Sequence, residues 1–280
     1  MTDRGDTTGR PLVMGVLNVT PDSFSDGGRF LDPDAAVAHG LAMAAEGADI
    51  VDVGGESTRP GADPVGAVEE CRRVVPVIHE LARHVRVSID TRHAVVAEAA
   101  VAAGATLVND VSASLGRLTA ALGPDVGFVA MHMLGDPRTM QDDPHYDDVV
   151  ADVRQFLVAR AEEAAALGVA EVWIDPGIGF GKSVEHNLAL LAHLDGLVDS
   201  GFPVVVGTSR KRFLGVLLAA ADGLSPAETV ATDDRLEGSI ATAAWAMWHG
   251  ASMIRAHDVR ATVLAARAVA RAHDERSAGT

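Results

Sequence analysis

Short apolar runs recur along the chain, and each is followed by a polar loop and then by a segment with helical spacing. The first run covers residues 13–17 and breaks at Asn18 into a polar loop that ends in paired glycines. Further runs lie at residues 50–53, 85–89, 107–108, 128–131, 172–174, 204–206 and 253–254. Such continuously apolar runs are typical of strands that are buried on both faces, as in a parallel sheet.

The segments between these runs have apolar residues three or four positions apart and therefore predict helices. Asp32 and Asp63, each followed by a proline, predict the starts of the first two helices. Ser225 and Glu228 resemble a capping box, which predicts a helical region that reaches almost to Gly250. The other predicted helices cover residues 94–103, 115–122, 146–167 and 184–194, and a last one follows residue 258 as far as about residue 272.

This alternation amounts to about eight β-then-α units within 280 residues. A barrel built from such units needs about 250 residues, so the whole chain fits one domain. We therefore expect an α/β fold, a single-domain (β/α)8 TIM barrel rather than an open doubly wound sheet. The barrel should cover residues 11–273, between a disordered lead at residues 1–10 and a flexible tail at residues 274–280.

Composition narrows the function classes. The formal net charge of -16 argues against a broad basic face for nucleic acid. The single cysteine, Cys71, excludes an internal disulfide and fits a reducing cytoplasm. Because no stretch approaches the ~18 apolar residues of a membrane span, and the first residues lack a signal-peptide pattern, we expect a cytoplasmic protein without a membrane partner.

Polar residues follow each predicted strand, where a parallel barrel opens on one face. Residues far apart in the sequence should therefore converge on one pocket. A single Asp or Asn after a strand is often only a helix N-cap, which suffices for Asp110 and Asp258. A whole ring is harder to explain by capping. Its members are Asn18, Thr58, Arg59, Asp90, Asn109, His132, Asp175, Ser209, Lys211, Arg255 and His257.

The ring has two chemical characters. Asp90, Asn109, Asp175 and Lys211 offer acceptors and donors that suit a flat polar heterocycle, since a carboxylate accepts two N–H bonds and a lysine donates to a ring carbonyl. Other members of the ring are cations or donors, and arginine forks match phosphate geometry. This second set, an anion subsite, consists of Asn18, Arg59, Arg255 and His257.

Two further possibilities concern this anion subsite. Asn18 and Asp26 are oxygen donors that could hold Mg²⁺ against a phosphate. Alternatively, Arg59 and Arg255 form salt bridges with carboxylates at the rim. Other site types fit poorly, because the chain has no nucleotide-binding glycine fingerprint, no Walker loop, no cysteine set for zinc and no nucleophile elbow.

Eight motifs together resemble dihydropteroate synthase. They are GVLNVTPDSFSDGG, VDVGGESTRPGA, SIDT, NDVS, MHM, DPGIGFGK, GTSRKRFLG and RAHD, in the order found in that family. The resemblance implies a (β/α)8 barrel that forms a homodimer. It also implies a transferase of folate biosynthesis that joins 6-hydroxymethyl-7,8-dihydropterin pyrophosphate to p-aminobenzoate and releases pyrophosphate. Ala256 departs from the pattern, where a larger aliphatic residue is common.

The same resemblance assigns roles to individual residues. The pterin is expected at Asp90, Asn109, Asp175 and Lys211, with Met131 and Phe180 along its pocket. Pyrophosphate is expected at Asn18, Arg59, Arg255 and His257, with Thr58 at the boundary and Asn18 and Asp26 serving Mg²⁺. Phe24, Pro60 and Ser209 match positions that line the aminobenzoate subsite, which is also the target of sulfonamides.

The chemistry of the implied reaction agrees with these residues. Pyrophosphate leaves an exocyclic CH2 carbon, and an electron-rich pterin can delocalise the positive charge, so we expect an SN1-like displacement. Catalysis then needs orientation and neutralisation of the leaving group rather than a strong base. We expect Asp175, Lys211, Arg255 and His257, with Asp26 and Arg59 on the first two loops, to carry it.

Two other classes of protein are possible. One is a pterin-binding methyltransferase domain on a similar barrel, which uses a folate methyl group and a corrinoid partner, but the SFSDGG and STRPG loops and the RAHD end argue against it. A non-catalytic pterin binder would be expected to have lost Asp175, Lys211 or Arg255, and the sequence retains all three.

Overall fold

The computed structural model describes residues 9–20, 32–57, 64–136, 138–225 and 228–278. Parallel strands occupy its centre in the order β6-β5-β4-β3-β2-β1-β8-β7, and a single bridge between Ile174 and Val204 joins the two ends. The strands are β1 (Leu12–Asn18), β2 (Ile50–Gly54), β3 (Arg86–Asp90), β4 (Leu107–Asp110), β5 (Gly127–Met131), β6 (Val172–Asp175), β7 (Val205–Val206) and β8 (Met253–Ala256). The expected single-domain (β/α)8 barrel is confirmed.

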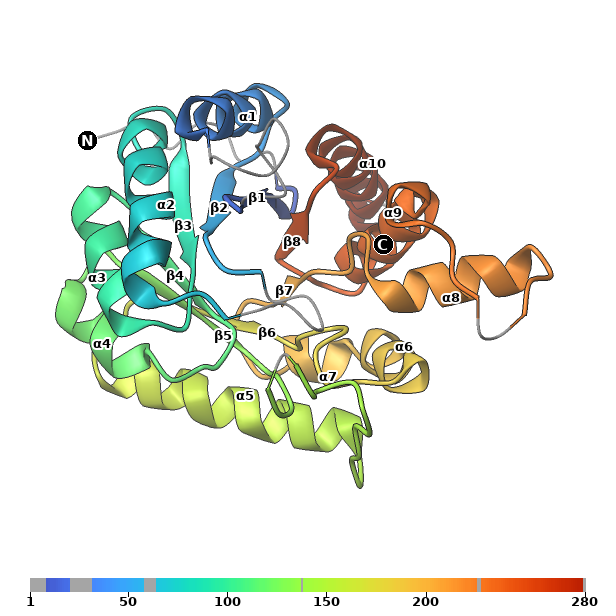
Figure 1. Cartoon of the computed structure of the whole chain (residues 1–280). Coiled ribbons are helices and arrows are strands. Elements are labelled where there is room, and N and C mark those ends of the chain that lie inside the picture. Colours follow the sequence, from blue (N-terminus) through green and yellow to red (C-terminus); the bar gives the residue numbers. More distant parts are fainter. Residues whose placement is uncertain (1–8, 21–31, 58–63, 137, 226–227, 279–280) are drawn as a thin grey trace.

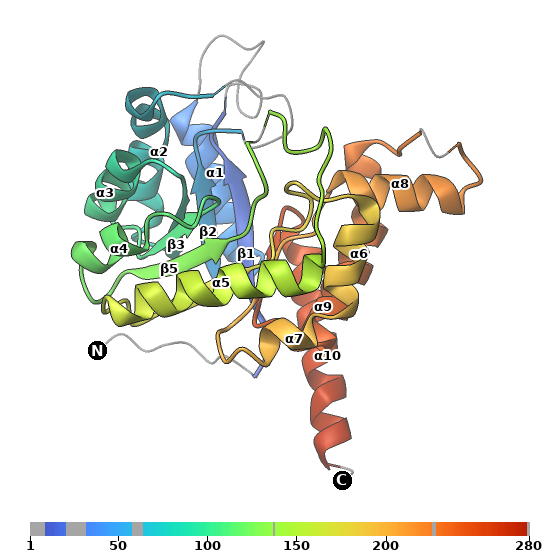
Figure 2. The same cartoon turned by 90° about the horizontal axis from the view of Figure 1, so that it is seen from below.

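Helices surround this barrel on its outer side (Figures 1 and 2). They are α1 (Pro33–Ala45), α2 (Ala67–Leu81), α3 (Ala94–Ala103), α4 (Gly116–Leu122), α5 (Val149–Ala166), α6 (Val184–Ala192), α7 (Asp195–Val198), α8 (Arg212–Ala221), α9 (Leu236–Trp248) and α10 (Val259–Ala278). Within the described ranges, none of them combines the length and apolarity needed to cross a membrane.

The helix starts test the capping predictions. The Asp32 carboxylate accepts hydrogen bonds from the backbone N–H groups of Asp34 and Ala35, which confirms the predicted N-cap of α1. The start predicted at residues 63 and 64 is wrong, because α2 begins at Ala67. Gly66 is the N-cap of α2, and the backbone N–H of Val65, just before it, donates to the Glu56 side chain at 3.1 Å.

The capping box predicted near Ser225 is half formed but starts no helix. The backbone N–H of Ser225 donates to the Glu228 carboxylate at 2.7 Å. However, residues 228–231 are irregular and α9 begins only at Leu236. The Arg235 guanidinium donates to the carbonyl oxygens of Val230, at 2.7 Å, and Arg210, at 2.9 Å. The bond to Arg210, 25 positions away, holds this stretch as a loop against α8, a helix that the sequence pattern had not separated.

The structure describes residues on the outer side of both predicted boundaries of the barrel domain. Arg10, expected in the disordered lead, donates to both carboxylate oxygens of Asp49 at 2.8 and 2.9 Å. At the other end, α10 continues through residues 274–278, which were expected to form part of a flexible tail (Figure 2). Residues 1–8, 279 and 280 lie outside the described residues.

The apolar core inside the barrel determines where the pocket begins along the barrel axis. Side chains alternate along a strand, so residues two positions apart share a face. An apolar cluster fills the interior, with one residue each from seven strands: Met14, Ile50, Leu107, Val129, Trp173, Val205 and Met253. Two positions after five of these residues lie Asn109, Met131, Asp175, Gly207 and Arg255, all of which line the pocket, and Gly207 directly follows the end of β7. The apolar cluster is therefore the floor of the site.

Neighbouring valines on α3 give a test of the outer core. Val96 is fully buried against the barrel, whereas Val95 is 60% exposed. We expect Val96→Ala to lower the free energy of unfolding by about 1–3 kcal/mol, because it removes two buried methyl groups and leaves a cavity. Val95→Ala has the same change in helix propensity and should leave stability almost unchanged. Denaturant unfolding of both variants measures the difference, and equal losses would contradict the packing of α3.

Candidate active site

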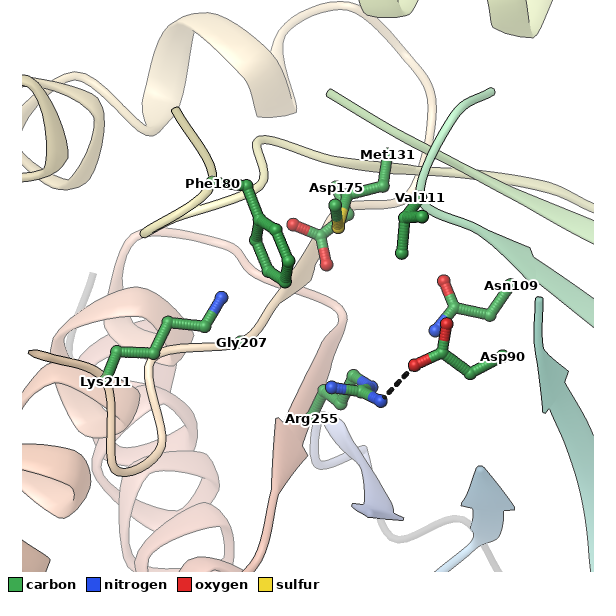
Figure 3. A pocket seen from close by; sticks show the side chains of 9 residues that line it. All are labelled: Asp90, Asn109, Val111, Met131, Asp175, Phe180, Gly207, Lys211 and Arg255. Atoms are coloured by element: carbon green, nitrogen blue, oxygen red, sulfur yellow. Dashed lines mark hydrogen bonds and ion pairs between the residues drawn. The ribbon is translucent and has the colours of Figure 1, made fainter. Parts of the chain in front are cut away.

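One pocket opens at the carboxyl ends of the strands, on the face expected from the ring of polar residues. Figure 3 shows its lining from several strands and loops. The lining residues are Asp90, Asn109, Val111, Met131, Asp175, Phe180, Gly207, Lys211 and Arg255. All six residues assigned to the pterin by resemblance are thus brought together, and Arg255 joins them.

Arg255 is held between two carboxylates at the base of this pocket. Its Nε donates to Asp52 and its Nη2 donates to Asp90, both at 2.7 Å. Asp52 also accepts a hydrogen bond from the Asn109 amide at 3.0 Å. The network therefore joins β8, β2, β3 and β4. Arg255 therefore forms the salt bridges with carboxylates that were one of the two possibilities for it.

The electrostatics of this network follow from burial and pairing. Burial raises the pKa of the Asp90 carboxyl to about 7, and the charge of Arg255 opposes the rise. Burial also disfavours the charged guanidinium of Arg255, but Asp52 and Asp90 more than compensate and raise its pKa. Because Asp90 Oδ2 lies 2.7 Å from Nη2 of the permanently charged Arg255 guanidinium, we assign the Asp90 carboxyl as ionised.

Asp175 and Lys211 form the opposite side of the pocket, with Phe180 between them (Figure 3). Asp175 Oδ1 accepts a hydrogen bond from the Gly177 N–H at 2.7 Å. Burial raises the pKa of Asp175, and nearby Lys211 lowers it again. Lys211 donates to the Ile178 carbonyl and lies 4.5 Å from the centroid of the Phe180 ring. Burial lowers the pKa of Lys211 to about 8.

Three other predicted members of the ring lie at strand ends but do not line this pocket. Asn18 is the last residue of β1 and pairs in register with Gly54. Ser209 Oγ accepts the backbone N–H of His257 and lies within 3.1 Å of His257 Nδ1, so these two residues are adjacent. Five further candidates lie outside the described residues; they are Phe24, Asp26, Thr58, Arg59 and Pro60.

His132 is buried beside the pocket rather than facing it. Its Nδ1 lies 3.0 Å from the ammonium of Lys182, and its ring packs edge-on against Phe156. Burial and the charge of Lys182 lower the pKa of His132 to about 3. The imidazole is therefore neutral at pH 7 and its Nδ1 acts as an acceptor, so His132 has a packing and hydrogen-bonding role.

Comparison with known proteins agrees with this geometry. A family model described as a pterin binding enzyme matches residues 14–257. The dihydropteroate synthase of Mycobacterium leprae is 52% identical over 267 residues, which are 92% of each chain. The chain belongs to the dihydropteroate synthase family.

Solved structures of this family share the fold. The Xanthomonas albilineans dihydropteroate synthase in complex with 7,8-dihydropteroate is 45% identical, with a TM-score of 0.80 over 94% of this chain and 93% of that chain. The Yersinia pestis dihydropteroate synthase with a sulfonamide drug is 42% identical, with a TM-score of 0.86 over 98% of this chain and 99% of that chain. The resemblance read from the motifs is thereby confirmed, and with it a transferase family.

Sequence reasoning missed three residues of this dihydropteroate synthase-family site. Val111 and Gly207 line the pocket but carry no polar group that marks them. Asp52, which is fully buried, organises Arg255 and Asn109. A signal for it was present, because a carboxylate within an apolar strand must find a cationic or hydrogen-bonding partner.

The Arg255 network predicts a large loss of stability when its cation is removed. Arg255→Ala leaves Asp52 and Asp90 without their ionic partner, and breaking a buried pair in this way costs about 3–5 kcal/mol. Denaturant unfolding measures the loss. Arg72→Ala is the matched control, since Arg72 pairs with Glu69 on the exposed face of α2 and its loss should change stability little. Equal stabilities of the two variants would show that the network contributes nothing.

Proposed function

We propose that this protein catalyses the dihydropteroate synthase reaction, in which 6-hydroxymethyl-7,8-dihydropterin pyrophosphate and p-aminobenzoate give 7,8-dihydropteroate and pyrophosphate. One observation carries the proposal. Asp90, Asn109, Asp175 and Lys211 line a single pocket above an apolar floor, so donors and acceptors converge on the edges of a flat ring. The relatives in complex with 7,8-dihydropteroate and with a sulfonamide support the same substrates.

The pterin half would lie between the two polar sides of the pocket. On one side, Asp175 presents a carboxylate that accepts the N–H groups of the guanidine-like edge. Phe180 and Met131 would supply apolar contacts to the flat faces of the pterin ring. Lys211 would donate to the ring carbonyl, for which its ammonium is already oriented by the Ile178 carbonyl and the Phe180 ring.

The pyrophosphate half would lie toward β1 and β8. Among the described residues, Arg255 uses Nε and Nη2 for its carboxylates, and no hydrogen bond within that part of the chain occupies Nη1, which can donate to a phosphate oxygen. His257 and Asn18 lie at the neighbouring strand ends, and Arg59 would complete the subsite. This assignment explains how Arg255 can bridge the pterin and pyrophosphate halves.

Mg²⁺ is the one cofactor that the family implies. Asn18 offers an amide oxygen at the end of β1, and oxygen donors are those that Mg²⁺ prefers, so the described residue fits. Asp26, the second proposed ligand, lies outside the described residues. Mg²⁺ held there would help to neutralise the negative charge of the departing pyrophosphate.

The protein's own residues would then act by orientation and electrostatics. As the bond from the exocyclic CH2 carbon to pyrophosphate lengthens, positive charge spreads into the pterin, and the Asp175 carboxylate counters it. Arg255, His257 and Arg59 would stabilise the charge that collects on pyrophosphate. The neutral amine of p-aminobenzoate, held by Phe24, Pro60 and Ser209 with Thr58 at the boundary to the pyrophosphate, then attacks the carbon. The displacement is thus SN1-like and needs no strong base.

We also propose a cytoplasmic homodimer. Trp245 and Trp248 lie one turn apart on α9 and are 49% and 37% exposed. Leu188 on α6 is 41% exposed, and the Trp245 indole N–H donates to the Leu191 carbonyl of that helix. Large apolar side chains gathered on neighbouring helices in this way suit a face that a second copy covers.

A direct assay tests the proposed reaction. Purified protein is given the pterin pyrophosphate, p-aminobenzoate and Mg²⁺, and the release of pyrophosphate and formation of dihydropteroate are followed. We expect release that requires both organic substrates and falls when Mg²⁺ is chelated. A protein that binds the pterin but releases no pyrophosphate above the uncatalysed rate would instead be the non-catalytic pterin binder.

The carboxylate of Asp175 provides a mutational test. In Asp175→Asn, the amide oxygen can keep the hydrogen bond from the Gly177 N–H, which turns the NH2 group toward the donor edge of the pterin. Two donors then face each other, so we expect pterin binding to weaken by about 1–3 kcal/mol. Calorimetry with a pterin that lacks phosphates measures this. Asp142→Asn, at an exposed position, is the control. Unchanged affinity in Asp175→Asn would remove Asp175 from the site.

A further inference from the structure

A lysine that the reaction does not use is buried directly behind the pocket. Lys182 is 3% exposed, and within the described ranges no carboxylate oxygen lies within 4.0 Å of its ammonium. Placing an ammonium in the interior is costly unless its hydrogen bonds are made. The ammonium can therefore occupy this position only if the surrounding groups supply acceptors for its hydrogen bonds.

The Lys182 ammonium is bound by backbone carbonyl groups from two loops. It donates to the carbonyl oxygens of Gly177 and Phe180, both at 3.1 Å, and to that of His132 at 3.3 Å. His132 Nδ1 lies 3.0 Å away as a fourth acceptor. Since His132 follows β5 and the two other residues follow β6, one side chain ties together the loops that leave these adjacent strands.

Close contact between the same loops shows how specific this arrangement is. Gly177 has φ of +63°, and a Cβ there would collide with the His132 carbonyl group. Gly181 also has φ of +63°, and a Cβ there would collide with the backbone of Leu134. Only glycine allows the two backbones to approach this closely. Three carbonyl oxygens thereby converge on one point, which the ammonium occupies.

Each carbonyl that Lys182 holds belongs to a residue tied to the pocket. His132 follows Met131, which lines the pocket. Gly177 donates its N–H to Asp175 Oδ1 at 2.7 Å, and Phe180 places its ring against Lys211. Lys182 itself does not line the pocket. Its influence on a ligand must therefore pass through Asp175, Phe180 and Met131.

We propose that Lys182 is a positioning residue for the pterin half of the substrate: its ammonium gathers the carbonyl groups of His132, Gly177 and Phe180 and so fixes the spacing of Asp175, Phe180 and Met131. The inference rests on the proposed function, because it concerns the ligand of that pocket. It predicts an effect on pterin recognition that is larger than the effect on the second substrate.

The test compares Lys182→Met with Tyr146→Phe. Methionine keeps the length of the side chain but donates to no carbonyl. Tyr146 is the matched control, because its hydroxyl donates at 2.8 Å to the Gly181 carbonyl of the same loop but touches none of the three carbonyl groups that Lys182 holds. We expect Lys182→Met to weaken binding of a phosphate-free pterin at least tenfold in calorimetry. We expect Tyr146→Phe to stay within twofold of the wild-type protein.

Kinetics separate positioning from general damage to the fold. In Lys182→Met, KM for the pterin pyrophosphate should rise at least tenfold, while KM for p-aminobenzoate should stay within about twofold. A double-mutant cycle combines Lys182→Met with Phe180→Ala. Lys182→Met should reduce pterin affinity less in the Phe180→Ala protein than in the wild-type protein, because part of its effect passes through Phe180. If Lys182→Met does not fold, Lys182→Gln, which keeps two donor hydrogens, is measured in the same way.

The outcomes are distinct. Lys182 variants that are less stable but bind the pterin as the wild-type protein does would overturn the inference and make Lys182 a purely structural residue. Equal losses for the pterin and p-aminobenzoate would also overturn it. If the wild-type protein itself fails to bind the pterin, the proposed function is wrong instead.

Discussion

The ion pairs of Arg255 with Asp52 and Asp90 are the interaction on which the site depends. The partners are separated by 203 and 165 positions in the sequence, and the hydrogen bonds are 2.7 Å long. Together they connect β8 with β2 and β3 inside the barrel, where the Asp52 side chain is fully buried and those of Arg255 and Asp90 are mostly buried. A buried pair of this kind contributes little net stability compared with apolar residues of equal volume, but it fixes where each group lies. Asn109 joins the same network through Asp52, so the position of its amide is tied to that of Arg255.

The apolar cluster beneath this network explains why polar groups can gather there. Seven strands each place one apolar side chain in the interior, and the next inward position carries a residue of the site on most of them. The floor excludes water from below, which strengthens every electrostatic contact above it. The same exclusion raises the pKa of Asp175 and lowers the pKa of Lys211 to about 8. Each group is therefore easier to neutralise alone, and each depends on the other for its charge.

Charged groups of both signs gather around this pocket although the chain as a whole carries a net charge of -16. Asp52 and Asp90 pair with Arg255, and the charges of Asp175 and Lys211 stabilise each other. A pyrophosphate adds negative charge, which explains why the proposed anion subsite draws on further donors at the ends of β1 and β8.

Much of this protein was readable from the sequence, because the signals are local. Apolar runs placed the strands, and Asp32 marked the start of α1 correctly. The polar strand ends converged on one pocket because parallel strands in a barrel all point the same way. Motifs rich in Gly, Asp and Asn identified the dihydropteroate synthase family, since its site is built from strand-end loops that each lie within a short stretch of sequence.

Only the tertiary structure decided the rest, because those features depend on residues that are distant in the sequence. Arg235 reaches the Arg210 carbonyl across 25 positions and holds the residues before α9 against α8. The roles of Asp52 and Lys182 depend on partners from other strands and loops. Periodicity reports which face of an element is buried, but it carries no information on which buried polar group meets which. That pairing is set by the register and closure of the barrel.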